Sequence, residues 1–157
     1  MMNFGFTESL LAILALLLVV AAVIDVRTYV ISNRLNLAVA LLAPVFWWSI
    51  GLPLWPNVAI QLALALGVFT LLALPFCLGM MGGGDVKLGA ALALWFPPDA
   101  ILAFLVIMSL AGGVLTLVVV AVHRLRKKEG RPEIPYGVAI AIGGLAILTQ
   151  RFLNHFA

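Results

Sequence analysis

Two of the six acidic residues in this 157-residue chain have the position needed for acid–base chemistry. Asp25 follows an unbroken apolar run, residues 10–24, and Asp85 closes the run Met-Met-Gly-Gly-Gly at residues 80–84. An ionisable group beside such segments is costly in a bilayer unless it is paired or hydrated. Two carboxyl groups that meet in one site can share a proton, because the charge of one disfavours the charge of the other. Such a pair offers an acid that hydrogen-bonds a peptide carbonyl and a base that activates water.

Each aspartate also has a purely structural explanation. Asp25 could end a helix at the membrane interface, and Asp85 could be the N-cap of the next helix. The three glycines before Asp85 favour the chemical interpretation, because they lack side chains and let the backbone of an extended peptide come close. We therefore predict that Asp25 and Asp85 are catalytic. The predicted substrate-binding residues are Gly82, Gly83, Gly84, Asn33 and Lys87.

The composition places these residues in a membrane protein. Hydrophobic residues make up 65% of the chain and charged residues 10%, whereas a soluble domain carries about a quarter charged residues. Because a transmembrane helix needs about 20 apolar residues, apolar runs bounded by Pro, Gly, Asn or charge indicate the spans. We expect one all-α polytopic domain over residues 1–157 with six transmembrane helices. The predicted spans are residues 8–25, 35–50, 58–78, 86–96, 100–122 and 136–153.

The fourth predicted span is too short for an ordinary transmembrane helix. Residues 86–96 make about 16 Å of helix, against about 30 Å of hydrocarbon core. Either this helix is tilted in a thinned region, or it begins well inside the membrane in a wet cavity.

The basic residues predict the orientation of the bundle. Of the nine Lys and Arg residues, eight follow the first, third and fifth predicted helices, and only Arg151 lies near the opposite end of the last one. By the positive-inside rule these connectors are cytoplasmic and both termini are extracytoplasmic. The sequence thus predicts a multi-pass inner-membrane protein with both aspartates at the cytoplasmic side. The net charge of +3 is accounted for by orientation and the lipid bilayer, so no nucleic-acid partner is expected.

The chain has few residues that could ligate a metal. Cys77 is the only cysteine, and His123 and His155 are far apart with no His-Glu-x-x-His motif. We therefore predict neither a metal nor a cofactor. The first apolar run has no basic segment ahead of it, unlike a secretory signal, and is expected to be a mature helix.

Residues 82–85 read Gly-Gly-Gly-Asp, which fits Gly-x-Gly-Asp, and the chain resembles the small type IV prepilin peptidases of the tight-adherence (Flp) pilus class. Two further segments resemble that family: Ile-Ser-Asn-Arg-Leu at 31–35, after Asp25, and Ile-Pro-Tyr-Gly-Val-Ala at 134–139. The resemblance covers most of the chain. It implies that Asp25 and Asp85 are the catalytic pair of an aspartic endopeptidase. Its substrate would be a type IV, Flp-like prepilin or pseudopilin, cut at the cytoplasmic membrane face before its hydrophobic helix.

Two departures from the family pattern stand out. Ser32 occupies the position where the family usually has proline, which makes that turn less rigid but removes no catalytic group. Larger members also methylate the new N-terminus and carry a cytoplasmic segment with Cys-x-x-Cys pairs. A chain with one cysteine cannot reproduce that segment, so methylation is not predicted.

Three other functions compete with this hypothesis. A presenilin-like protease shares Gly-x-Gly-Asp, but its other motif resembles Tyr-Asp, and here Ile24 precedes Asp25. A transporter or proton-relay bundle could line a pathway with the same two aspartates, although no inverted repeat relates the two halves of the chain. A structural membrane component would tolerate Asn at both positions.

Overall fold

The computed structural model describes residues 4–127, 130 and 132–156, so Lys128, Glu129 and Arg131 of the predicted basic connector lie outside the described residues. Within these residues the chain forms six α-helices and one short π-helical segment, which confirms the all-α prediction. The helices are α1 (Phe4–Thr28), α2 (Asn33–Ser49), α3 (Ala59–Cys77), α4 (Gly83–Ala93), α5 (Pro98–Leu125) and α6 (Tyr136–Phe156), and the π-helical segment η1 (Leu54–Val58) precedes α3.

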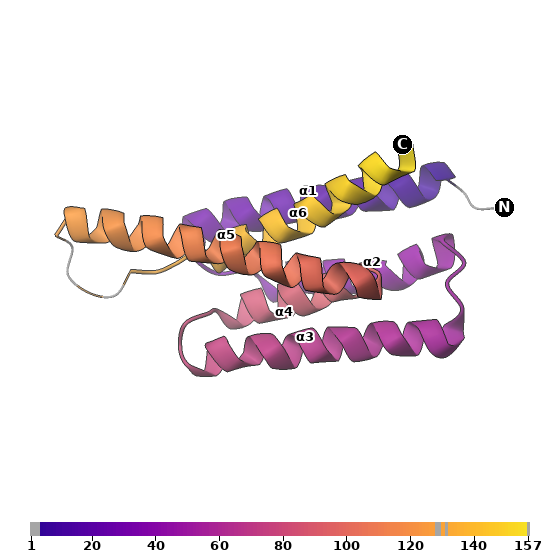
Figure 1. The fold of residues 1–157 in the computed structure, drawn as a ribbon, viewed down its shortest axis with the longest axis horizontal. Helices are drawn as coiled ribbons and strands as arrows, with labels where there is room; N and C mark the ends of the chain where they lie inside the picture. The colour runs from indigo at the N-terminus through magenta and orange to yellow at the C-terminus, as the bar shows by residue number, and fades with distance from the viewer. Residues whose placement is uncertain (1–3, 128–129, 131, 157) are drawn as a thin grey trace.

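The helices run back and forth along one axis. In Figure 1 the connectors α1–α2, α3–α4 and α5–α6 lie at one end, and the α2–α3 connector lies at the opposite end with both termini. The described basic residues that follow α1, α3 and α5 are therefore gathered at the end away from the termini. This alternation is the one that the charge pattern predicted.

Four helical segments are long and apolar enough to cross a membrane. They are Gly5–Thr28, Leu54–Cys77, Pro98–Leu125 and Tyr136–Leu153. The other two helices are shorter, with 17 residues in α2 and 11 in α4. Six complete spans therefore remain a prediction, and α4, at about 1.5 Å per residue, covers only about half of a hydrocarbon core.

The two helices that carry the aspartates differ from the predicted boundaries. The helix α1 continues to Thr28, so Asp25 lies inside its last turn rather than at its end. The helix α4 begins at Gly83, three residues before the predicted start, so the glycines at 83 and 84 belong to its first turn. Glycine has a low helix propensity, which is why the sequence favoured a loop there, but packing against neighbouring helices outweighs that preference.

Ser32 has a clear structural task in place of the expected proline. It is the N-cap of α2, and its hydroxyl accepts a hydrogen bond from the Leu35 N–H at 3.3 Å. A serine N-cap satisfies one of the free N–H groups of a helix start. The turn after α1 is thus defined by capping rather than by a proline ring.

The short helix α4 lies at the centre of the bundle and packs against α2, α3 and α6. Its residues Leu88 and Leu92 have no exposed surface. The last carbonyls of a helix have no partner within the helix and need other donors. Side chains supply them at the end of α4: the Gln61 amide donates to the carbonyl of Ala93 and to that of Phe96 in the following connector, and the Trp47 indole donates to that of Leu94 at 2.7 Å.

Candidate active site

Asp25 points from the last turn of α1 toward the start of α6. Only 1% of its surface is exposed. The backbone N–H groups of Gly137 and Val138, in the first turn of α6, face its carboxylate. The start of a helix carries partial positive charge, which favours an anion there. A β-carbon at position 137 would lie 2.8 Å from Asp25 Oδ2, so glycine is required for this approach.

Asp85 is the third residue of α4 and is 5% exposed. Its Oδ2 accepts a hydrogen bond from the Gly82 N–H at 3.1 Å, and Gly82 is the N-cap residue. Asp85 therefore does stabilise the helix start, although from the N3 position and not as the N-cap considered from the sequence. Its other oxygen, Oδ1, is buried and accepts no hydrogen bond from the described residues.

The fold brings the two carboxyl groups into one buried region, near enough to interact electrostatically. Asp25 Oδ2, Asp85 Oδ1 and Asn36 Oδ1 are all buried acceptors without a hydrogen-bond donor in the part of the chain that the structure describes. A buried acceptor without a donor costs about 1–3 kcal/mol. A proton held between the carboxyl groups, a water molecule or a bound peptide would supply the missing donors. The arrangement can therefore act as an acid and a base on one bound group.

Ile31 packs against the starts of both α4 and α6, close to the two aspartates. A β-carbon on Gly84 would lie 2.6 Å from the Ile31 carbonyl oxygen, and one on Gly137 would lie 2.5 Å from Ile31 Cδ1. The sequence analysis assigned no site role to Ile31 or Gly137. The available signal was the Pro-Tyr-Gly sequence that opens α6, because a glycine in the first turn of a helix indicates close approach by another group.

Gly82, Gly83 and Gly84 were predicted to bind substrate, and the fold shows what two of them contact within the protein. Gly84 is close-packed against the Ile31 backbone of the same chain, and a β-carbon on Gly83 would lie 3.3 Å from the Phe76 ring. The small size of these two glycines is thus used within the protein itself. Contact of residues 82–84 with a substrate stays a prediction.

Asn33 and Lys87 lie together at the rim of a groove of about 480 Å³ between α2, α3 and α4. The Lys87 ammonium donates a hydrogen bond to Asn33 Oδ1 at 2.8 Å, and both side chains are exposed. Asn36 also lines the groove, and its amide donates to the Gly84 carbonyl at 2.9 Å. Asn36 therefore links the groove to the first turn of α4, which carries Asp85.

No three His, Cys, Asp or Glu side chains gather in a possible metal site among the residues for which the structure gives positions. The titratable groups at the centre of the candidate site are the two carboxyl groups of Asp25 and Asp85.

Comparison with known proteins agrees with the resemblance seen in the motifs. The model of the type IV leader peptidase family matches residues 12–117, a range that contains both aspartates. The chain is 28% identical over 155 residues to proteins named prepilin leader peptidase/N-methyltransferase from Burkholderia pseudomallei strains 1026b and K96243. These alignments cover 92% of this chain and 45% of each relative, so the chain spans less than half the length of those proteins. No solved structure matches the chain.

Proposed function

We propose that this chain, which belongs to the type IV leader peptidase family, is a membrane aspartic endopeptidase that removes the leader peptide from type IV prepilins. The observation that carries the proposal is that Asp25 and Asp85 are both buried and near enough to interact electrostatically, each with a carboxylate oxygen that lacks a donor among the described residues. We place catalysis at the cytoplasmic face of the bacterial inner membrane, because the connectors at this end of the bundle hold most of the basic residues. Residues 1–157 form a single catalytic domain in this proposal.

The two aspartates would divide the chemistry of peptide hydrolysis. Asp25 faces two backbone amides at the start of α6, which can donate to a carboxylate, so we assign it the role of the base. It takes a proton from water as the water oxygen attacks the peptide carbonyl. Protonated Asp85 donates a hydrogen bond to the carbonyl oxygen and stabilises the charge that develops there. The C–N bond then breaks as the leaving nitrogen receives the proton held by Asp25, which returns the pair to its starting state.

The expected substrate is a prepilin or pseudopilin of the Flp-like type, cut just before its hydrophobic helix. The groove of α2, α3 and α4 supports this class of substrate, since its walls are mostly apolar and its rim holds Asn33 and Lys87. An apolar helix could lie along the walls while the peptide that precedes it reaches Asp85 at the start of α4. Gly82, Asn33 and Lys87 would then contact the peptide backbone.

Co-expression with a Flp-type prepilin tests this function. The wild-type chain should shift the prepilin to higher mobility on a gel, whereas Asp25→Asn and Asp85→Asn should each lose cleavage by at least about a hundredfold, the usual contribution of an acid or base. Glu133→Gln is the matched control, because this exposed carboxylate lies in the connector before α6 and should leave cleavage unchanged. Membrane insertion of each variant is measured alongside. Cleavage that persists in either aspartate variant contradicts the mechanism, and failure of the inserted wild type on several prepilins favours the transporter alternative.

A further inference from the structure

A second cavity, of about 780 Å³, lies at the other end of the bundle from the aspartates. Its lining comes from the start of α1, the end of α2, the start of α3, the α4–α5 connector and the end of α6. The cavity exists because α4 ends at Ala93 after 11 residues, so its connector crosses the middle of the bundle while the neighbouring helices continue. The space beyond that connector is not filled by protein.

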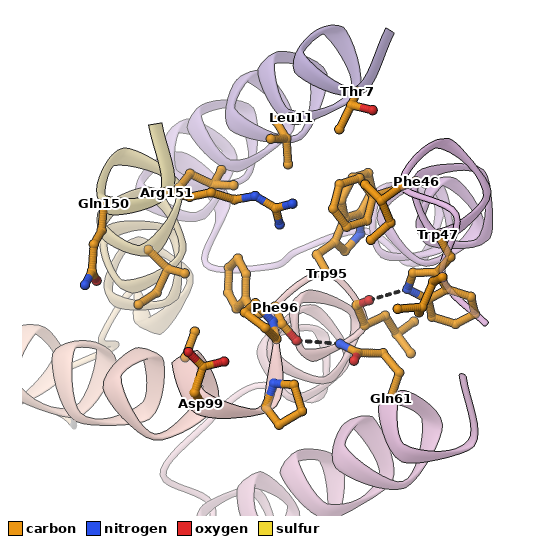
Figure 2. A pocket seen from close by; sticks show the side chains of 18 of the residues that line it. Thr7, Leu11, Phe46, Trp47, Gln61, Trp95, Phe96, Asp99, Gln150 and Arg151 are labelled. Atoms are coloured by element: carbon orange, nitrogen blue, oxygen red, sulfur yellow. Dashed lines mark hydrogen bonds between the residues drawn. The ribbon is translucent and has the colours of Figure 1, made fainter. Parts of the chain in front are cut away.

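The wall of this cavity is largely apolar and includes several aromatic rings, although polar side chains such as Asn57 and Gln150 also line it. Phe46 and Trp95 stack with ring centres 5.0 Å apart, and Trp47 and Phe96 line the same space. The indole N–H of Trp95 donates to the Val39 carbonyl at 3.0 Å, and that of Trp47 is already bonded to a backbone carbonyl. The wall therefore presents apolar surface to whatever occupies the cavity. Figure 2 shows these rings arranged around the opening.

Arg151 brings a positive charge into this apolar space. Its guanidinium points into the cavity and lies 5.0 Å from the centre of the Phe46 ring, while Asp99 lies farther down beyond Phe96 (Figure 2). A cation–π contact satisfies part of the charge, but a guanidinium with five N–H donors in an apolar setting favours an anionic oxygen partner. Two carboxylates, Glu8 and Asp99, line the same cavity. The site thus combines one cation, two anions and an aromatic wall.

We propose that this cavity binds one phospholipid whose zwitterionic headgroup carries a primary ammonium group, as in phosphatidylethanolamine. The phosphate oxygens accept hydrogen bonds from Arg151, because guanidinium and phosphate form charge-assisted bidentate pairs. The ammonium lies toward Glu8, and one acyl chain begins along the aromatic wall and leaves the cavity into the bilayer. The cavity volume is within the usual range of ligand sites, about 300–1,000 Å³.

The charge pattern distinguishes this headgroup from the other common ones. A headgroup with a phosphate and no amine, such as phosphatidylglycerol, brings a net negative charge near Glu8, and its hydroxyls offer the carboxylate only neutral donors. A choline headgroup keeps the positive charge but has no N–H to donate to a carboxylate. Of these three headgroups, only ethanolamine offers Glu8 a charged N–H donor while Arg151 holds the phosphate. The proposal concerns the end of the bundle away from the aspartates and does not depend on the peptidase function.

Tryptophan quenching by lipids with dibrominated acyl chains tests the proposal. The detergent-solubilised full chain is used with Trp48→Phe and Trp55→Phe, because these two tryptophans are 76% and 81% exposed and would report on bulk amphiphile. The remaining indoles, Trp47 and Trp95, line the cavity. Saturable quenching is expected with dibrominated phosphatidylethanolamine at about tenfold lower lipid than with the choline or glycerol headgroup, the effect of one good charge-assisted bond.

Two further substitutions in this background test the two ends of the headgroup. Arg151→Gln should abolish the saturable quenching, whereas Arg124→Gln, in the last turn of α5 at the other end of the bundle, should leave it intact. Glu8→Gln should keep phospholipid binding but remove the difference between ethanolamine and glycerol headgroups. Equal quenching by all three lipids, or quenching that neither substitution alters, overturns the proposal and means that the cavity holds bulk amphiphile or water only. Circular dichroism confirms that each variant remains helical.

Discussion

At the scale of single residues, the two oxygens of the Asp85 carboxyl group differ: one has a structural task and the other is assigned a chemical one in the proposed mechanism. Oδ2 accepts a hydrogen bond from the Gly82 N–H at the start of α4, while Oδ1 is buried without a donor among the described residues. Because the two tasks use different atoms, substitutions can separate them. An asparagine keeps an oxygen that accepts from Gly82, but it cannot serve as a carboxylic acid or carboxylate.

We therefore expect Asp85→Asn and Asp85→Ala to differ in stability and to agree in activity. Both should lose prepilin cleavage. Asp85→Asn should unfold within about 0.5 kcal/mol of the wild type, whereas Asp85→Ala should lose about 1 kcal/mol with the capping bond. Unfolding in detergent, followed by circular dichroism, measures the stability and a gel shift measures the cleavage. Equal stability of the two variants would show that the Gly82 bond contributes nothing.

Gly137 gives a second prediction at this scale. A β-carbon there would lie 2.8 Å from Asp25 Oδ2 and 2.9 Å from its carboxyl carbon, so Gly137→Ala must displace the carboxylate or the start of α6. We expect cleavage to fall by at least about a hundredfold, as for misplacement of a reacting group by about 1 Å. Gly113→Ala is the matched control, because nothing lies within 4 Å of its added β-carbon. Cleavage by Gly137→Ala at the control level would contradict the close approach.

At the scale of elements, α4 depends on side chains from its neighbours because it begins and ends among other helices. Asn36 from α2 donates to the Gly84 carbonyl in its first turn, and Gln61 from α3 donates to two carbonyls at its end. These bonds hold the helix that carries Asp85 in place along its axis. The same short helix leaves the space that forms the aromatic cavity, so one feature of α4 shapes both ends of the bundle.

Removal of the Gln61 amide should destabilise the fold strongly. Gln61→Leu keeps the side-chain size but leaves the carbonyls of Ala93 and Phe96 buried without this donor, at a cost of about 1–3 kcal/mol each. Thr70→Val is the control, since the Thr70 hydroxyl bonds only to the Leu66 carbonyl of its own helix on an exposed face, and the change should be within about 0.5 kcal/mol. Thermal unfolding in detergent compares the two. A Gln61→Leu loss no larger than the control would show that these carbonyls find other partners.

At the scale of the whole molecule, the arrangement of connectors predicts which surfaces face each side of the membrane. Cysteine labelling in a Cys77→Ser background tests this with two exposed positions, Met80 in the α3–α4 connector and Leu54 in η1. We expect a membrane-impermeant maleimide added to spheroplasts to label Leu54→Cys and not Met80→Cys. Both should be labelled after permeabilisation. The reverse pattern would place the aspartates at the extracytoplasmic side and contradict the proposed site of catalysis.

The sequence by itself determined the helical elements and singled out two aspartates, whose catalytic role stays a prediction. Apolar runs can satisfy their backbone in lipid only as helices, and all six helices begin within four residues of the predicted starts. The positions of the Lys and Arg residues along the chain predicted which connectors lie at the same end of the bundle. The run of three glycines before Asp85 also set residues 82–85 apart from the apolar segments on either side.

Only the tertiary structure decided which groups surround those aspartates. The contact of Asp25 with Gly137 joins residues more than a hundred positions apart, and no local pattern specifies it. The earlier start of α4 also depends on such contacts, since packing against Ile31 and Phe76 stabilises glycines that favour a loop when taken alone. Arg151 was visible from the sequence only as an exception in the charge pattern. Its place over Phe46 in an aromatic cavity follows from the length of a different helix, because a bundle encloses space wherever one of its members stops short.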